Sequence, residues 1–226
     1  TAVSASCPVG IKPHMVLPSP DKSLVAISYT GDRHVHILDA TTRMIRMCLE
    51  VKTEGSKIHT GHWMVGEGSS LLFVMVDMTG KIHGASGGGG LHLWRIDKGS
   101  NMGTLISSLS MPISFLLPSS STKPIAAGST RLGDNTNILF VTDAKQGGGF
   151  FVEVSTLSLT PKGRIQSSQL GNCKGGGGLW VSTVEDSKSR LMAVYGKQET
   201  NTSCIVEVDV STKLLSRVIH LPATSI

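Results

Sequence analysis

The chain has 226 residues, of which 39% are hydrophobic and 16% are charged, and this is enough for one sizeable core. No apolar run approaches the ~20 residues that a membrane-spanning helix needs, so we expect no transmembrane segment. The formal net charge is +5, but the basic residues are spread out and are not interleaved with aromatic residues. This pattern argues against a nucleic-acid-binding surface.

Residues 12–51 predict four short strands joined by three tight turns. The turns read SPDK, TGDR and DATT, in which Pro, Gly and Asp favour reversal of the chain. The strands are short, apolar and rich in β-branched residues, and we expect them at 14–17, 24–29, 34–38 and 44–51. A single sheet of this kind must cover its faces with neighbouring sheets, as the blades of a β-propeller do.

The same segment, KPHMVLPSPDKSLVAISYTGDRHVHILDATTRMIRMCLEV, resembles the YVTN-type β-propeller repeat family. That family includes bacterial relatives similar to cytochrome d1-domain propellers. The similarity is strong over 12–51, moderate over 57–96 and weak beyond. The resemblance implies an all-β fold, a β-propeller of four-stranded antiparallel blades. It implies little about activity, because one fold hosts many functions.

The rest of the chain predicts three more units of the same kind. Asp39, Asp97, Ser155 and Asp209 stand at equivalent corners, with separations of 58, 58 and 54 residues. We therefore predict a single propeller domain over 1–226, with units at 12–56, 57–112, 113–171 and 172–226. In the third unit, strands are expected at 115–117, 138–143, 150–157 and 163–170. Either these four blades close a compact ring, or they form part of a larger ring, which the resemblance favours because the family more often has seven blades.

Three glycine runs, at 87–90, 147–149 and 175–178, each come directly before an apolar strand. They are either flexible turns or shortened loops in which glycine linkers replace longer segments. Trp94 and Trp180 follow two of these runs, and we expect both indoles to pack between blades.

Histidines supply the candidate site. His14 and His59 occupy the same position at the start of two successive units, where the first strand of a blade lines the central channel. With His62 nearby, they are candidate ligands of a metal ion such as zinc, copper or iron. The alternative is that these side chains hydrogen-bond the backbone at the channel wall. His34 and His36 flank Val35 and share one face of their strand, which is a weak metal signal.

Residues 84–88 read GASGG and match the spacing G-x-S-x-G, but they lead into an expected strand and not into a helix, so they do not form the strand–turn–helix elbow of a nucleophilic serine. A lactonase-type propeller would need a cluster of acidic metal ligands, which we cannot assemble from this sequence. We therefore expect a non-catalytic scaffold or protein-interaction subunit, working with other protein subunits in a larger assembly and without a cofactor. The alternative is a propeller that holds a metal or redox cofactor in its channel through His14 and His59.

The four cysteines, Cys7, Cys48, Cys173 and Cys204, permit two disulfides in any of three pairings, and the sequence does not choose among them. The triplet beginning at Asn201 fits an N-glycosylation sequon. Because propellers of the resembled family are commonly exported, we expect an extracytoplasmic setting, whether periplasmic, lumenal or secreted. The start at Thr1, with no leader sequence, suggests a processed form or a fragment.

Overall fold

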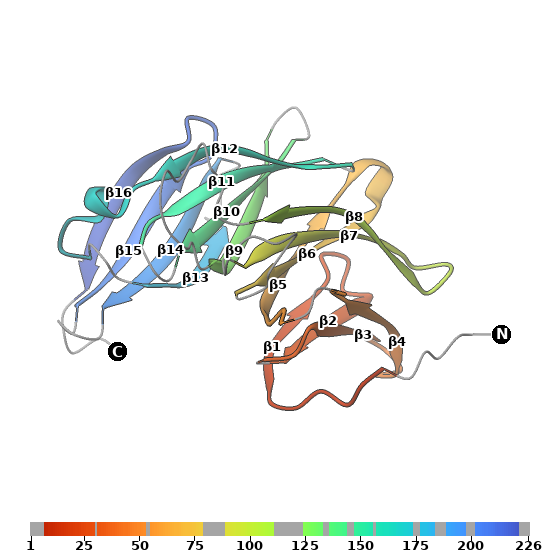
Figure 1. Ribbon diagram of the computed structural model, residues 1–226. Helices are drawn as coiled ribbons and strands as arrows, with labels where there is room; N and C mark the ends of the chain where they lie inside the picture. The colour runs from red at the N-terminus through yellow and green to blue at the C-terminus, as the bar shows by residue number, and fades with distance from the viewer. Residues whose placement is uncertain are drawn as a thin grey trace. The chain divides into compact units, whose positions relative to one another are not determined.

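Four antiparallel sheets of four strands each make up the computed structural model of this chain (Figure 1). In every sheet the strands lie in chain order, as in the blade of a β-propeller. The predicted fold class is therefore confirmed. The structure describes residues 7–29, 31–52, 55–78, 89–110, 124–132, 136–143, 147–155, 157–173, 177–183, 189–197 and 202–221.

One blade falls within each predicted unit, and the blades group into two compact units of two blades each. Blade 1 comprises β1 (Pro13–Pro18), β2 (Leu24–Tyr29), β3 (His34–Asp39) and β4 (Ile45–Glu50). Blade 2 comprises β5 (Ile58–Val65), β6 (Leu71–Asp77), β7 (Gly90–Asp97) and β8 (Met102–Ser110), with the short 3-10 helix η1 (Glu67–Ser69) between β5 and β6. Blade 3 comprises β9 (Pro124–Arg131), β10 (Asn137–Asp143), β11 (Gly149–Val154) and β12 (Leu159–Ile165), followed by the 3-10 helix η2 (Ser167–Cys173). Blade 4 comprises β13 (Gly177–Thr183), β14 (Arg190–Lys197), β15 (Thr202–Asp209) and β16 (Leu214–Leu221).

Blade 3 departs from the strands predicted for it. The expected first strand at 115–117 lies outside the described residues, and the structure forms the first strand at β9 instead. The last strand, expected at 163–170, begins already at Leu159. Pro161 interrupts the alternation there, because the pairing of β11 with β12 shifts register beside it. Proline is tolerated at this outer edge of a sheet, where its missing N–H is not needed.

Blades 1 and 2 share one apolar core. Alternate residues of β2, β3 and β4 point toward blade 2, and the buried set includes Leu24, Ala26, Val35, Ile37, Leu49, Phe73, Met75 and Trp94. Polar contacts also join the blades: the indole Nε1–H of Trp63 donates to the Leu17 carbonyl at 2.8 Å, and the Ser28 hydroxyl donates to the His59 carbonyl at 3.1 Å. Trp94 is buried, as expected.

Blades 3 and 4 have a core of their own. Phe140 and Phe151 lie with ring centroids 4.9 Å apart, among buried aliphatic residues of β14 and β15. Gly128 of β9 approaches Val181 of β13 so closely that a side chain at this position would overlap it. The expectation that Trp180 packs between blades is wrong, since this side chain is 49% exposed. A register shift between Gly178 and Trp180 reverses the alternation and gives the buried position to Val181.

The corner turns have the same construction in three blades. Asp39, Asp97 and Asp209 each accept two backbone N–H groups, from the residues two and three positions further along the chain. The residue four positions after each aspartate has positive φ, at 60°, 54° and 61° for Arg43, Asn101 and Lys213. This shared turn explains the near-constant spacing of the aspartates in the sequence.

Glycine is required on steric grounds where two of the glycine runs enter strands. Gly89 and Gly148 have φ values of 50° and 73°, in the left-handed region that favours glycine. A Cβ atom at these positions would collide with the carbonyl groups of Asp77 and Ile165.

A disulfide links Cys173, at the end of η2, to Cys204 of β15, with 6.3 Å between their Cα atoms. Of the two disulfides that four cysteines permit, this one forms, and Cys7 and Cys48 are free thiols. Among the residues that the structure describes, no helix is both long enough and apolar enough to cross a membrane.

Candidate functional site

His14 and His59 lie side by side on the first strands of two successive blades, β1 and β5. Their Nε2 atoms are 3.2 Å apart, and the ring centroids are separated by 4.3 Å with a tilt of 43°. His14 is exposed and His59 is half-buried. The structure thus brings together the two histidines that the sequence repeat placed at equivalent positions.

The distance between these two Nε2 atoms suits two kinds of chemistry. If one Nε2 carries a proton, it donates a hydrogen bond to the lone pair of the other. If neither does, both lone pairs can bind one ion, since two nitrogen ligands ~2.0 Å from a tetrahedral metal lie about 3.3 Å apart.

His62 lies three residues further along β5 and does not join these two in a group of three ligands. Removal from water lowers the pKa of His62 to about 4, so the ring is neutral at physiological pH. Within the described part of the chain, the group of three ligand side chains whose donor atoms all lie within 4.8 Å of one another is a different one: Cys7, His36 and Cys48.

The cysteine–histidine cluster forms on the face of blade 1 that points away from blade 2. Cys48 of β4 is the cross-strand partner of His36 of β3. His36 is only 4% exposed, and both of its ring nitrogens have neighbours: the Tyr29 hydroxyl lies 2.8 Å from Nδ1, and the Pro8 carbonyl lies 3.0 Å from Nε2. Burial, followed by the neighbouring Cys7 thiol, raises the pKa of Cys48, which therefore stays protonated at neutral pH.

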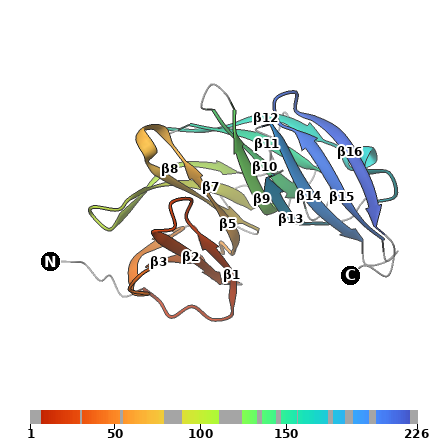
Figure 2. The same ribbon diagram turned by 180° about the vertical axis from the view of Figure 1, so that it is seen from behind.

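The segment before β1 completes this cluster. Residues 7–12 run from the outer strand β4 toward the inner strand β1 of blade 1 (red in Figures 1 and 2). Gly10 lies so close to the Tyr29 ring that a side chain there would overlap it, and the N–H of Ile11 donates to Asp32 Oδ2 at 3.1 Å. These contacts hold Cys7 beside Cys48.

Sequence reasoning did not find this cluster, although it placed His34 and His36 on a shared face. The two rings do share that face, 5.0 Å apart. Counting residues back from the β3–β4 turn pairs His36 with Met47, but a register shift between Ile37 and Leu38 moves the pairing by one residue to Cys48. The contribution of Cys7 depends on a segment outside the repeat.

A second polar group, in blade 2, was also missed. The Ser108 hydroxyl lies 2.9 Å from His92 Nδ1, and His92 Nε2 lies 3.6 Å from Asp77 Oδ2. Asp77 also accepts the backbone N–H of Lys57 at 3.0 Å. His92 and Asp77 are both buried. Through Ser108 and Lys57 they connect β6, β7, β8 and the residue before β5. We therefore interpret this group as structural.

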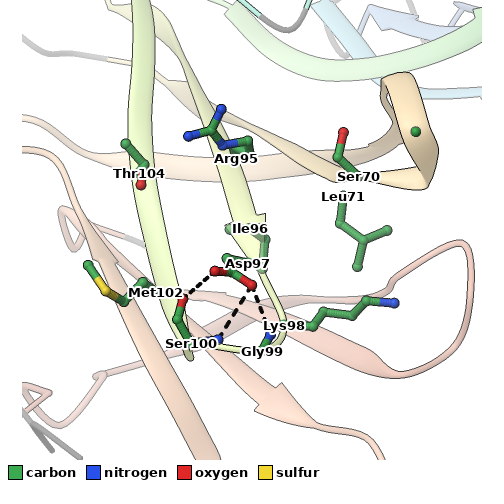
Figure 3. A pocket seen from close by; sticks show the side chains of 11 residues that line it. Ser70, Leu71, Arg95, Ile96, Asp97, Lys98, Gly99, Ser100, Met102 and Thr104 are labelled. Atoms are coloured by element: carbon green, nitrogen blue, oxygen red, sulfur yellow. Dashed lines mark hydrogen bonds between the residues drawn. The ribbon is translucent and has the colours of Figure 1, made fainter.

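A pocket of about 610 Å³ lies at the β7–β8 turn of blade 2 (Figure 3). Leu71, Ile96 and Met102 contribute apolar surface and Arg95 contributes positive charge, whereas the Lys98 ammonium is paired with Asp21 Oδ2 at 2.6 Å. The Asp97 carboxylate in this pocket accepts hydrogen bonds from its own turn, including one of 2.6 Å from Ser100 Oγ. The pocket can therefore hold an apolar group that carries negative charge.

Several solved structures have the same fold at low sequence identity. The hydrazine synthase of Kuenenia stuttgartiensis aligns with 98% of this chain and 52% of its own, at a TM-score of 0.62 and 12% identity. The WD40 domain of SCAP from fission yeast aligns with 93% of this chain and 42% of its own, at a TM-score of 0.59 and 12% identity. The periplasmic gluconolactonase of Pseudomonas aeruginosa aligns with 92% of this chain and 53% of its own, at a TM-score of 0.58 and 10% identity.

These likenesses establish the β-propeller fold and nothing narrower, because the proteins that share it differ in function. The chain spans about half the length of the solved chains it matches. No model of a known protein family matches the sequence, and no curated protein does.

Proposed function

We propose that this chain is a non-catalytic β-propeller that serves as a scaffold or protein-interaction subunit in a larger assembly. The observation that carries the proposal is a set of exposed apolar side chains on the outer edge of blades 1 and 2. Met44, Ile45, Met102 and Leu105, here called the rim patch, are 70%, 51%, 60% and 46% exposed. Exposed apolar surface of this kind is typical of sites where another protein binds.

The rim patch lies on two outer strands that adjoin. Gly103 of β8 meets the side chains of Leu49 and Met47 of β4. Ile45 begins β4, Met102 precedes Gly103 and Leu105 follows it by two residues, so apolar side chains occur on both strands near this junction. Met102 also lines the pocket at the β7–β8 turn, which extends the surface toward Arg95 and Lys98.

The side chains of this combined surface indicate what kind of segment a partner would dock on it. Its apolar side chains favour an apolar segment, and the Arg95 guanidinium favours an acidic residue next to that segment. We therefore infer a protein partner that docks an acidic and apolar segment along β8.

Cross-linking mass spectrometry of the assembly, isolated from its native source, tests this proposal. Lys98 lies in the pocket, and Lys162 of β12 is the matched control on another blade. The proposal expects peptides of a partner protein linked to Lys98 and not to Lys162. Links to Lys162 alone would contradict it.

A second function is favoured by the 3.2 Å between His14 and His59 Nε2, which suits a metal or redox cofactor in the channel. In this alternative His14 and His59 are ligands, and His62 on the same strand as His59 is the third candidate. Elemental analysis and an absorption spectrum of the purified chain and of its His14→Asn variant test it. A colourless, metal-free protein would exclude it.

We also propose a cellular setting, a family and a ring size for this chain. We infer an extracytoplasmic setting, which the Cys173–Cys204 disulfide supports, because disulfides persist in oxidising compartments. Membership of the YVTN-type family is supported by the repeat motifs of blade 1, and we propose a larger ring because that family more often has seven blades.

A further inference from the structure

The cysteine–histidine cluster of blade 1 contains the ligand types that zinc prefers, and we propose that Cys7, His36 and Cys48 bind one zinc ion. This site is separate from the histidine pair on β1 and β5 and does not depend on the rim patch. The donor atoms of the three side chains all lie within 4.8 Å of one another. In a tetrahedral zinc site two sulfur ligands lie about 3.8 Å apart, and a sulfur and a nitrogen ligand about 3.6 Å apart. A contraction of at most about 1 Å therefore completes the site.

His36 can become a ligand by moving one proton. A carbonyl only accepts hydrogen bonds, so Nε2–H donates to Pro8 and Nδ1 accepts from the Tyr29 hydroxyl. When zinc takes Nε2, the ring proton moves to Nδ1, which then donates to the Tyr29 hydroxyl oxygen. Histidine ligands commonly make such a bond through their second nitrogen, because it fixes the orientation of the ring.

The charge balance favours a divalent ion such as zinc over Cu⁺. One Zn²⁺ displaces one proton from each of the Cys7 and Cys48 thiols, and the two protons pass to solvent. Two thiolates, one neutral imidazole and Zn²⁺ form a complex without net charge, which suits half-buried thiols and a buried ring. Cu⁺ with the same ligands would keep one negative charge. Three protein ligands leave the fourth position of zinc for a water molecule.

The zinc ion would connect parts of the chain that are distant in sequence. Cys7 belongs to the segment before β1, whereas His36 and Cys48 lie on β3 and β4. Coordination would fasten this segment across the face of blade 1. It would also protect both thiols from oxidation to a disulfide, because the thiolate electrons are held by the metal.

Zinc loading of the whole chain tests the proposal. The protein is purified under argon without a thiol reductant, so that the Cys173–Cys204 disulfide stays intact, and is then incubated with ZnCl₂, passed through a desalting column and analysed for zinc by elemental analysis. We expect one zinc per chain in the unaltered protein and in the control variant His14→Asn, which removes the other candidate site. In Cys7→Ser we expect zinc affinity to fall by more than about 100-fold, the upper end of the loss for an outer partner of a metal ligand.

Cobalt gives a second readout that does not depend on the amount of zinc retained. Co²⁺ bound by thiolates has intense charge-transfer absorption, which should appear in the unaltered chain and disappear in Cys7→Ser and Cys48→Ser. Circular dichroism of Cys7→Ser shows whether the fold is kept, since Cys7 lies outside every strand.

Three results would overturn the inference. These are an unaltered chain that retains no zinc, a Cys7→Ser variant that retains as much zinc as the unaltered chain, and a Cys7–Cys48 disulfide in protein alkylated at the moment of lysis. The last result would show that the two thiols serve as an oxidisable pair instead.

Discussion

Lys98 Nζ lies 2.6 Å from Asp21 Oδ2, and this ion pair joins the β7–β8 turn of blade 2 to the β1–β2 turn of blade 1. Burial alone would raise the pKa of Asp21, but the hydrogen bonds from Lys98, Ser19 and Ser23 outweigh it and hold that pKa well below its usual value. The ion pair is partly exposed, so its contribution to stability is modest.

We predict that Lys98→Met lowers the free energy of unfolding by about 0.5–1 kcal/mol at pH 7, as measured by urea denaturation. Because the folded state holds the pKa of Asp21 down, the contribution is present above the ordinary aspartate value of about 3.9 and is lost as the pH falls below it. The difference between Lys98→Met and the unaltered chain should therefore shrink in acid. A difference that grows between pH 5 and pH 3 would contradict this assignment.

Trp63 connects blades 1 and 2 through both its ring and its Nε1–H. We predict that Trp63→Phe lowers the free energy of unfolding by about 2 kcal/mol, because it leaves a gap in the core and removes the donor to the Leu17 carbonyl. The control is Trp180→Phe, which changes an indole that is 49% exposed and should cost less than about 0.5 kcal/mol. Equal costs for the two variants would show that Trp63 does not hold the blades together.

The corner aspartates should stabilise their turns, and an asparagine variant should recover stability that an alanine variant loses. Asp97→Ala removes the acceptor of two backbone N–H groups and should lower the midpoint temperature of unfolding. Asp97→Asn keeps a side-chain oxygen at the same place and should recover most of that loss. Thermal unfolding followed by circular dichroism measures both, and an Asn variant as unstable as the Ala variant would count against the shared turn.

The Cys173–Cys204 disulfide closes a loop across a sequence separation of 31 residues. Its replacement in Cys173→Ser should lower the free energy of unfolding by about 3 kcal/mol, the range for a loop of this size. Cys7→Ser in the metal-free protein serves as the control and should change little. If an alkylating reagent labels Cys173 in the native, unreduced protein, the pairing is wrong.

The fold could be predicted from the sequence because each blade repeats a local pattern. In blade 1, β2 has the bounds that its apolar run predicted, and His14 and His59 meet as the repeat implied. Prediction failed where the pattern is interrupted. Pro161 interrupts the strand pattern near the start of β12, so this strand was predicted to begin too late. A register shift at Leu179 turns the Trp180 side chain outward.

The Cys7, His36 and Cys48 cluster could not be derived from the sequence for a similar reason. Its third member depends on one extra residue in β4, which changes the partner of His36. Its first member depends on how a segment outside the repeat crosses the sheet. Neither feature leaves a periodic signal, whereas the histidine pair on β1 and β5 does.

The most direct test of the proposed interaction surface is the mass of the native assembly, measured by light scattering after size-exclusion chromatography. The chain, its Leu105→Asp variant in the rim patch and its Leu214→Asp variant on β16 are each isolated from the native source. Leu105 and Leu214 are 46% and 60% exposed, so both variants should fold. We predict that the unaltered chain and Leu214→Asp elute as the same larger complex, and that Leu105→Asp elutes as the free chain. A Leu105→Asp variant that keeps the full mass of the complex would contradict the account.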